Sequence, residues 1–393
     1  MIRIAPPEDL LRVLRRLTEA GYPAYCVGGC IRDSLRGVAP ADWDVATAAL
    51  PEEVHRVFRD MRVIDTGEKH GTVTLLTGER SVEITTFRRE SGYSDRRRPD
   101  LVTFITDPTQ DLARRDFTVN AMAWAPEAGL LDPFGGQQDL EKKILRCVGD
   151  PTARFNEDAL RIMRGLRFAA TLRLTVEPAT DAAIRCCRDL LREIARERIT
   201  AELVRLLEGA EAGAMLREYP EVFAVFAPEL RAERWRWVQK APAHRITRLA
   251  ILLDDPSPLL RLRFSRQDIR LTEQLIRYKH EPDIACPALL KRILGDLGRE
   301  QTLRLLDLLE AGGNSLARER KIWVDRWIRD GVCLSLKDLS VKGSDLTNVG
   351  IPGGKAVGSI LDRLLQEVLE EKLPNERDAL LLRAEELKKE VES

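Results

Sequence analysis

Two adjacent glycines between an expected strand and an expected helix are the first feature of this sequence with a chemical meaning. Gly28 and Gly29 follow the β-type run AYCV and precede the helical run CIRDSLRG. Glycines let the backbone approach a bulky anion, and a helix N-terminus presents free N–H groups and positive partial charge. The pattern is typical of a phosphate-binding turn, although an ordinary strand-to-helix turn uses the same residues.

Two aspartates about a dozen residues later supply the second chemical feature. Asp42 and Asp44 flank Trp43 at the start of WDVAT, which we predict to be a strand with both carboxylates on one face. Adjacent carboxylates repel, and Mg²⁺, which binds carboxylate and phosphate oxygens, would offset that repulsion. An exposed turn could carry the same pair. Because the aspartate pair follows a phosphate-binding turn, we favour a site for two metal ions. Such ions can activate an attacking hydroxyl and stabilise the pyrophosphate that leaves.

Glu83 is a candidate third metal ligand. It lies in SVEITTF, another expected strand, on the same face as Thr85. A solvated strand face explains this pattern equally well, and both interpretations stay open.

A third feature is the segment 157–168, which we predict to be one helix with Asp158 and Arg161 on the same face. Aspartate only accepts hydrogen bonds and arginine only donates them. Cytosine and adenine each present an amino donor beside a ring acceptor, whereas uracil and guanine present the reverse order. A fixed Asp–Arg pair would therefore accept CTP and ATP and reject UTP and GTP. A plain ion pair on a solvated helix is the alternative.

The elements that must position these residues change in character along the chain. The length of 393 residues is typical of two or three domains. Residues 1–141 mix strand-like runs with helices, whereas the chain from 142 onward has almost entirely helical periodicity. The sequence thus predicts an α+β fold: a head with a small mixed sheet, followed by an all-helical remainder.

Composition disfavours a membrane-spanning or secreted protein and neither supports nor excludes an RNA-binding one. The 63 basic and 63 acidic residues cancel, so an RNA partner is not indicated by net charge, only by local clusters such as Arg96–Arg98. No run has the length and apolarity of a membrane span, and the N-terminus lacks the pattern of a signal peptide. Seven cysteines with no disulfide spacing agree with the cytoplasmic location that we expect.

Several of these motifs together resemble those of a known family. GG-x-x-RD-x-L-x-G followed by D-x-D resembles the nucleotidyltransferase motif of the DNA polymerase beta superfamily. More narrowly, the chain resembles bacterial class II CCA-adding enzymes, which are tRNA nucleotidyltransferases. The resemblance covers nearly the whole chain, in EKHGTVTL (68–75), EITTFR (83–88), RRDFTVNAMA (114–123), LLDPFGGQQDL (130–140), FNEDALRIMRGLRFAA (155–170), ERITAEL (197–203), VKGSDLTNVGIPGGKAVGSILDRLL (341–365) and LPNERDALL (373–381).

The resemblance implies a reaction. The 3′-hydroxyl of tRNA attacks the α-phosphate of CTP or ATP, pyrophosphate leaves, and Asp42 and Asp44 hold the Mg²⁺ ions, two of them by expectation. It also implies the nucleotide-binding residues, which are Gly28, Gly29, Arg32, Arg115, Asp158, Arg161, Arg164 and Arg167. Asp158 and Arg161 are the base-selecting pair in this scheme.

The resemblance also implies a four-part organisation. We expect a polymerase-beta-like catalytic head at 1–141, a nucleotide-selecting neck at 142–208, a helical body at 209–315 and a tRNA-binding tail at 316–393. In the tail, Lys342, Lys355 and the glycine-rich stretch 350–358 are candidate RNA contacts. The sequence leaves monomer and homodimer open.

Residues 85–104 resemble the loop that relatives use to switch from C to A, and we expect little regular structure there. Members that add only CC have a shortened loop, so its presence argues against a CC-only enzyme. An enzyme that adds only the final A to tRNA ending in CC is the close alternative. A poly(A) polymerase and a non-catalytic RNA-binding relative are more distant alternatives, the latter disfavoured because both aspartates are present.

Overall fold

The computed structural model describes residues 4–67, 71–93, 99–280 and 283–392. His70 and the cluster Arg96–Arg98 therefore lie outside the described residues. The chain divides into two compact units, Met1–Pro228 and Glu229–Ser393. The expected four-part division stays a prediction.

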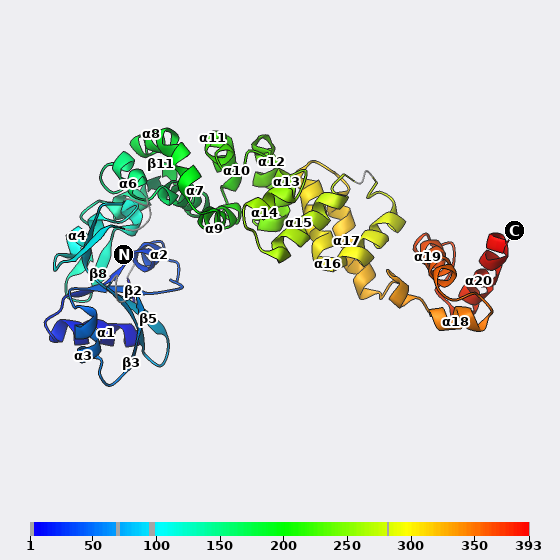
Figure 1. The fold of residues 1–393 in the computed structure, drawn as a ribbon, viewed down its shortest axis with the longest axis horizontal. Coiled ribbons are helices and arrows are strands. Elements are labelled where there is room, and N and C mark those ends of the chain that lie inside the picture. Colours follow the sequence, from blue (N-terminus) through cyan, green and yellow to red (C-terminus); the bar gives the residue numbers. More distant parts are fainter. Residues whose placement is uncertain (1–3, 68–70, 94–98, 281–282, 393) are drawn as a thin grey trace. The chain divides into compact units, whose positions relative to one another are not determined.

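The head is built on a mixed sheet that has seven strands in the described part of the chain (Figure 1). Its order is β3-β4-β5-β2-β1-β8-β9, with β2 and β5 parallel and the other neighbours antiparallel. The strands are β1 (Ala24–Val27), β2 (Asp44–Thr47), β3 (Arg62–Gly67), β4 (Thr72–Leu76), β5 (Ser81–Thr86), β8 (Ala123–Ala125) and β9 (Gly129–Leu131). The α+β class is confirmed. The short strands β8 and β9 are absent from the sequence-based prediction.

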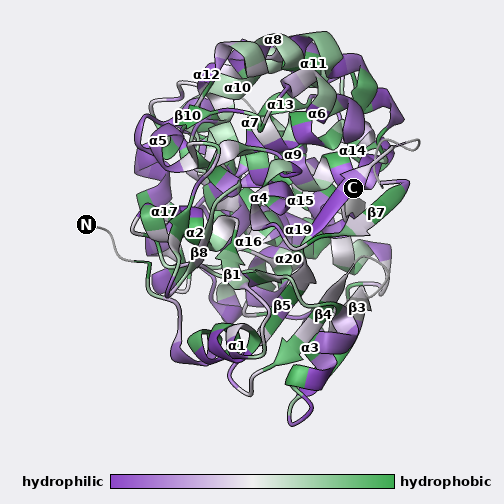
Figure 2. Cartoon of the chain, turned by 90° about the vertical axis from the view of Figure 1, so that its left-hand side faces the viewer, coloured by the Kyte–Doolittle hydropathy of each residue, from purple (hydrophilic) through white to green (hydrophobic). Residues whose placement is uncertain are grey.

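The two faces of this sheet pack into two different hydrophobic clusters. Cys26 and Val45 point into a core with Leu10, Leu14 and other residues of α1, whereas Val27 and Ala46 belong to a separate cluster on the opposite face. Helix α1 has one hydrophobic and one hydrophilic side (Figure 2). The helices of the head are α1 (Glu8–Glu19), α2 (Gly29–Leu35), α3 (Pro51–Val57), α4 (Pro108–Ala113) and α5 (Gly136–Glu141), with the 3-10 helix η2 (Thr118–Asn120).

The strand that carries the aspartates is shorter than predicted. It begins at Asp44, not at Trp43, and Asp42 precedes it in irregular backbone. The reason is the neighbouring strand: β1 ends at Val27, the partner of Asp44, because Gly28 turns the chain away. Trp43 is nevertheless buried between two exposed aspartates, so the expected alternation holds.

The expected irregular structure at 85–104 is partly wrong. Residues Arg88–Ser91 form the strand β6, which was not predicted, whereas β7 (Leu101–Phe104) coincides with the run LVTFI, whose β-branched residues predict a strand. The two strands are antiparallel and pair from Arg88 with Phe104 to Ser91 with Leu101. Glu90 stabilises this ribbon by accepting hydrogen bonds from Arg88 (2.7 Å), Arg114 (3.1 Å) and the Tyr93 hydroxyl (2.8 Å). These bonds connect β6 to Arg114 at the end of α4 and so fix this part of the loop against the head.

The helix predicted over 157–168 is broken, and this corrects the same-face argument for Asp158 and Arg161. Helix α6 ends at Glu157, Asp158 is extended (φ −141°, ψ 101°), and α7 begins at Leu160. The Asp158 carboxylate accepts the Leu160 amide at 3.1 Å, which is the usual way an aspartate begins a helix. Capping by aspartate thus overrides continuous helical periodicity.

The remaining elements of the first unit are helical apart from one short strand pair. They are β10 (Ile144–Leu145), α6 (Pro151–Glu157), α7 (Leu160–Leu172), β11 (Thr175–Val176), α8 (Pro178–Cys187), η3 (Arg188–Glu193), α9 (Arg196–Leu207), α10 (Ala212–Glu218) and α11 (Pro220–Ala224). Helix α7 packs against α9 and α10.

The described residues of the second unit form helices around two cores, one centred on α16 and α17 and one near the C-terminus. The elements are η4 (Ala232–Arg234), α12 (Trp235–Lys240), α13 (Arg245–Leu252), α14 (Ser257–Arg261), α15 (Arg266–Tyr278), α16 (Pro287–Ala311), α17 (Ala317–Arg329), η5 (Leu336–Asp338), α18 (Gly343–Asn348), α19 (Lys355–Leu369) and α20 (Arg377–Glu392). None of the described helices in the chain combines the length and apolarity of a membrane crossing.

Candidate active site

The glycine turn after β1 is shaped around an arginine. Gly28 has φ 79° and ψ −127°, a conformation that residues with a side chain rarely adopt. A Cβ at Gly28 would lie 2.8 Å from Nη1 of Arg115. Gly29 opens α2 with Arg32 packed above it, 3.5 Å from the position of a Cβ. Because α2 has only seven residues, the positive charge of the turn comes mainly from these two arginines.

Hydrogen bonds hold Arg32 in place. Its guanidinium donates two bonds to the Asp33 carboxylate, at 3.0 and 2.8 Å, and one from Nη1 to Oδ1 of Asn120 at 2.6 Å. Such a planar fork is well suited to phosphate oxygens, and its remaining donors are available for them.

Arg115 is in a less favourable environment. Desolvation lowers the pKa of its guanidinium, although Asp111, Asp116 and Asp44 oppose that shift. Among the described residues, its buried Nε finds no hydrogen-bond partner. A bound polyanion would stabilise this guanidinium, which is the behaviour expected of a residue kept for a ligand.

The carboxylates gather on the sheet face next to this turn. Asp44 on β2 is the direct neighbour of Glu83 on the parallel strand β5, and both side chains are exposed. Partial desolvation and the negative charges of Glu83 and Asp42 raise the pKa of Asp44, and Arg115 opposes the rise. Asp42, Glu83 and Arg115 therefore all act electrostatically on Asp44.

This donor set fits a hard divalent cation that shares its ligands with a substrate. Among the described residues, no three His, Cys, Asp or Glu side chains converge as a ready-made metal site. Mg²⁺ commonly takes only one or two protein carboxylates and completes its shell with phosphate oxygens and water. Desolvation, together with the negative charges of Glu83 and Asp42, raises the pKa of Asp44, and a bound cation would offset both effects.

Two arginines of α7 bond to carboxylates of the same unit, and one of them, Arg164, is connected to Arg32 through Asp116 and Asn120. Arg164 donates two hydrogen bonds to Asp116, at 2.8 and 2.6 Å, and Arg167 donates one to Glu202 at 2.5 Å. Asp116 is buried and also accepts a bond from Asn120 at 3.1 Å. Burial alone would raise the pKa of Asp116, but Arg164 and these hydrogen bonds hold it below its ordinary value.

The side chains of the two predicted base-selecting residues do not bond to each other, although the Arg161 amide donates to the Asp158 carbonyl oxygen at 3.0 Å. Asp158 accepts a bond from Arg198 at 2.9 Å, in addition to the Leu160 amide. Arg161 donates to Glu157 at 2.8 Å and to the carbonyl oxygens of Arg154 (3.3 Å) and Arg114 (3.0 Å). The structure thus places both residues at the junction of α6 and α7, each fixed by its own partner.

Five contributors to the site are absent from the sequence-based set: Asp116, Asn120, Phe168, Arg198 and Glu202. Asp116 and Asn120 lie inside the motif RRDFTVNAMA, so their polar character within an apolar run was an available signal. Glu202 lies in ERITAEL, where nothing in the local pattern distinguishes a buried partner of Arg167 from a solvated helix residue.

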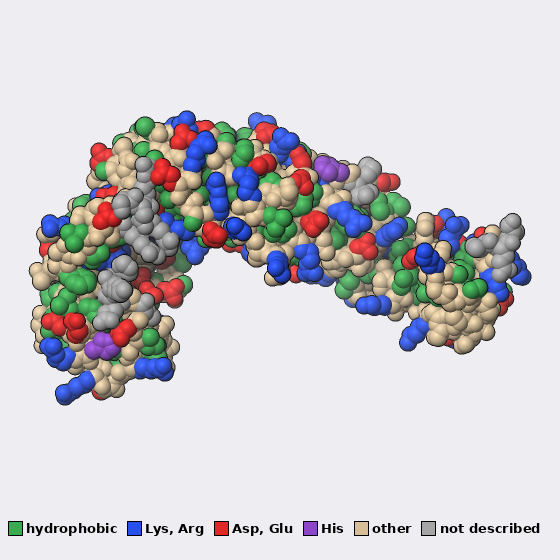
Figure 3. Space-filling view, in the orientation of Figure 1, with side chains coloured by type: hydrophobic (Ala, Val, Ile, Leu, Met, Phe, Trp, Pro, Cys, Tyr) green, Lys and Arg blue, Asp and Glu red, His purple; other side chains and the backbone are tan. Residues whose placement is uncertain are grey.

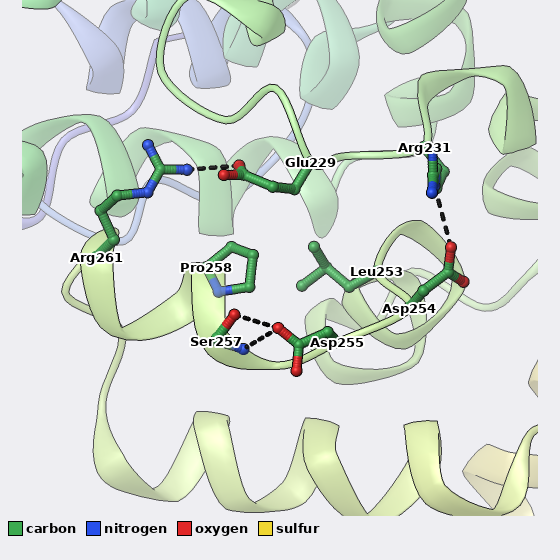
Figure 4. Close-up of a pocket in the computed structure, with 8 residues that line it drawn as sticks. All are labelled: Glu229, Arg231, Leu253, Asp254, Asp255, Ser257, Pro258 and Arg261. Atoms are coloured by element: carbon green, nitrogen blue, oxygen red, sulfur yellow. Dashed lines mark hydrogen bonds and ion pairs between the residues drawn. The ribbon is translucent and has the colours of Figure 1, made fainter.

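A separate pocket lies in the second unit and does not include any predicted site residue (Figure 4). It has a volume of about 480 Å³ and is lined by Glu229, Arg231, Leu253, Asp254, Asp255, Ser257, Pro258 and Arg261. Its charged side chains bond mainly to one another, as in the pairs Arg261 with Glu229 at 2.5 Å and Arg231 with Asp254 at 3.0 Å. Such internal pairing disfavours a charged ligand.

The candidate RNA contacts of the second unit are exposed. Lys342 and Lys355 lie at the N-terminal ends of α18 and α19, and Gly354 precedes the latter with φ 87°.

Comparisons with known proteins agree with the site and extend beyond it. Three family models match this chain: the poly A polymerase head domain at residues 24–146, a probable RNA and SrmB-binding site of polymerase A at 173–233, and a putative tRNA nucleotidyltransferase domain 2 at 247–384. The CCA-adding enzyme of Lacticaseibacillus paracasei is 36% identical, with 95% of each chain covered. That of Bacillus subtilis is 35% identical, with 93% of this chain and 95% of the relative covered.

Solved structures show the same likeness. The Bacillus stearothermophilus CCA-adding enzyme in complex with CTP superimposes with a TM-score of 0.83, at 29% identity over 99% of both chains. The Thermotoga maritima enzyme complexed with tRNA, at 21% identity and a TM-score of 0.73, shares the fold.

The head sheet, its glycine turn and the carboxylates beside it define a nucleotidyltransferase, a class of enzyme that is generally metal-dependent. Within that class, the chain belongs to the family of CCA-adding enzymes. The resemblance read from its motifs is therefore confirmed.

Proposed function

We propose that this enzyme adds CCA to the 3′ end of tRNA, using CTP and ATP and releasing pyrophosphate. The observation that supports it best is the placement of Asp44 and Glu83 on the sheet face beside Gly28 and Arg115. Carboxylates for a metal and donors for a triphosphate thus occupy one surface of the head. The relatives named above are all CCA-adding enzymes. The cytoplasmic location stays a prediction.

Asp42 and Asp44 are the proposed ligands of two Mg²⁺ ions, with Glu83 as a possible third carboxylate. When bound, such ions lower the pKa of a hydroxyl and stabilise negative charge on phosphate oxygens. Arg32 and Arg115 orient the triphosphate, and the Gly28 turn keeps the backbone out of the space that Arg115 occupies.

Asp158 and Arg161 are the proposed base-selecting residues. Their bonds to other groups do not use all of their hydrogen-bond donors and acceptors. A guanidinium has five N–H donors, and three bonds from Arg161 are present in the described structure. The Asp158 carboxylate, with about four acceptor sites, receives Leu160 and Arg198. Donors and acceptors therefore remain for a base edge, while Glu157 and Arg198 hold both side chains in place.

The direct experiment offers labelled CTP and ATP to two tRNA substrates, one ending at the discriminator base and one ending in CC. We expect both nucleotides to be incorporated into the first and ATP into the second, with Mg²⁺ required. Incorporation of ATP alone, and only into tRNA ending in CC, would replace the proposal by the A-adding alternative. Long adenylate tails would indicate a poly(A) polymerase, and no incorporation into either tRNA would leave the non-catalytic alternative.

A further inference from the structure

Three arginines that bind or flank the proposed nucleotide site surround a single aromatic ring. The guanidinium carbon of Arg167 lies 3.7 Å from the centroid of the Phe168 ring, and those of Arg32 and Arg164 lie 5.4 and 5.5 Å from it. Phe168 is 5% exposed and the side chains of Arg32 and Arg167 are 11% and 12% exposed, so these two contacts are largely desolvated, whereas the Arg164 side chain is 34% exposed.

These arginines come from different elements. Arg164 and Arg167 lie on α7, whereas Arg32 lies on α2 beside the glycine turn. The ring of Phe168 therefore lies where the phosphate-binding element of the head meets the helix of the neck. Phe117 supports the ring through a near-perpendicular contact, with 5.9 Å between centroids and 77° between planes.

Each of the three arginines around the ring forms an ion pair with a carboxylate. Arg32 is bonded to Asp33, Arg164 to Asp116 and Arg167 to Glu202. Each arginine is thus paired with a different carboxylate, and three like charges near one ring repel. An aromatic ring attracts cations through its quadrupole and does so best where water is excluded. A leucine side chain would fill much of this volume without that attraction.

We propose that Phe168 is a positioning residue for nucleotide binding, which acts by holding Arg32, Arg164 and Arg167 in one arrangement. It does not contact substrate in this proposal. Arg32 orients the triphosphate under the proposed function, and the family resemblance implies that Arg164 and Arg167 also contact the nucleotide, so the inference rests on that function. Loss of the ring should weaken the binding of CTP and ATP alike, since all three arginines are shared by both substrates.

The test compares Phe168→Leu with the wild-type enzyme in steady-state addition of CTP to tRNA ending at the discriminator base and of ATP to tRNA ending in CC. We expect the KM for each nucleotide to rise roughly 5- to 30-fold, which corresponds to one strong desolvated cation–π contact, with a much smaller change in kcat. Phe168→Tyr keeps the ring and should restore a KM close to that of the wild type.

Phe223→Leu is the matched control, because Phe223 is 1% exposed on α11 and lies outside the site. It should lower the thermal stability as Phe168→Leu does, without changing either KM. If Phe168→Leu does not fold at the assay temperature, Phe168→Met replaces it with the same expected KM.

An unchanged KM in a folded Phe168→Leu or Phe168→Met enzyme would overturn this inference and leave the proposed function intact. A Phe168→Tyr enzyme as impaired as Phe168→Leu, or an equal rise in KM for Phe223→Leu, would do the same. A wild-type enzyme that incorporates neither nucleotide would overturn the proposed function, and this inference with it.

Discussion

Asp44 lies beside two other carboxylates, and this single residue links the stability of the head to its proposed chemistry. Its pKa is raised, so the folded state holds a proton at Asp44 more strongly than the unfolded chain does. Stability therefore falls as pH rises from the ordinary pKa of aspartate through the raised value. At neutral pH without metal, the ionised Asp44 destabilises the fold.

We expect Asp44→Asn to stabilise the metal-free protein at pH 7 while it removes activity. The unfolding temperature should rise by about 1–2 °C, a modest effect because solvent screens an exposed carboxylate. Nucleotide addition should fall about a thousandfold or more, since a metal ligand is lost. Calorimetry with a chelator at pH 7 and pH 3 checks the first part, because the gain should vanish at the lower pH. A lower unfolding temperature at pH 7 would contradict this assignment.

Asp158 offers a second prediction at this scale, because it both caps α7 and is proposed to read the base. Asp158→Ala should raise the use of UTP and GTP relative to CTP and ATP by on the order of 100-fold. Loss of the cap should lower the free energy of unfolding by about 1 kcal/mol. Competition between nucleotides in single-addition assays measures the first effect and urea unfolding the second.

Asp189→Ala is the control, because Asp189 is exposed and paired only with Arg192 in the described structure, at 3.3 Å. It should leave selectivity unchanged. Unaltered selectivity in Asp158→Ala as well would remove Asp158 from the base-selecting role.

At the scale of elements, the site depends on how β1, β2 and α2 meet. The pairing of Val27 with Asp44 ends both strands at the same level, so that the glycine turn and the aspartates lie side by side. Gly28 then turns the chain into α2 with a backbone that leaves room for Arg115.

Gly28→Ala should therefore raise the KM for CTP and ATP by about tenfold or more. The added Cβ would lie 2.8 Å from Nη1 of Arg115 and would push the guanidinium out of its position. The positive φ adds a destabilisation of about 1–2 kcal/mol. Gly78→Ala separates the two effects: its φ is also positive, at 90°, but nothing lies within 4 Å of its Cβ position. It should lose similar stability with no change in KM. Equal effects of both substitutions on KM would show that Arg115 is not the cause.

At the scale of the whole molecule, RNA binding must arise from the distribution of charge, since net charge is zero. Acidic and basic side chains are intermingled over the face shown in Figure 3. The exposed Lys342 and Lys355 at the starts of α18 and α19 are the proposed tail contacts to the phosphate backbone.

The double substitution Lys342→Ala, Lys355→Ala should weaken tRNA binding and reduce the slope of log Kd against log salt by about 2, one unit for each lost phosphate contact. Addition to a short RNA that ends in CC should be unaffected, because the head site is unchanged. Titration of labelled tRNA at several salt concentrations measures the slope. An unchanged affinity and slope would exclude both lysines from the interface.

The sequence by itself determined the mixed sheet of the head, the helical remainder, the glycine turn and the pair of aspartates. These follow from local periodicity, from the conformational freedom of glycine and from strand alternation, all of which act over a few residues. It also predicted the family, because the motifs are long and occur in order.

Only the tertiary structure decided how the side chains pair. Asp158 interrupts the expected helix and bonds to Arg198, Arg161 bonds to Glu157, and Glu202 lies against Arg167. The ring of Phe168 became the common neighbour of three arginines in the same way. Such partners are up to 136 residues apart in sequence, from Arg32 to Phe168. Their contacts depend on the packing of α2, α7 and α9, which no local pattern specifies.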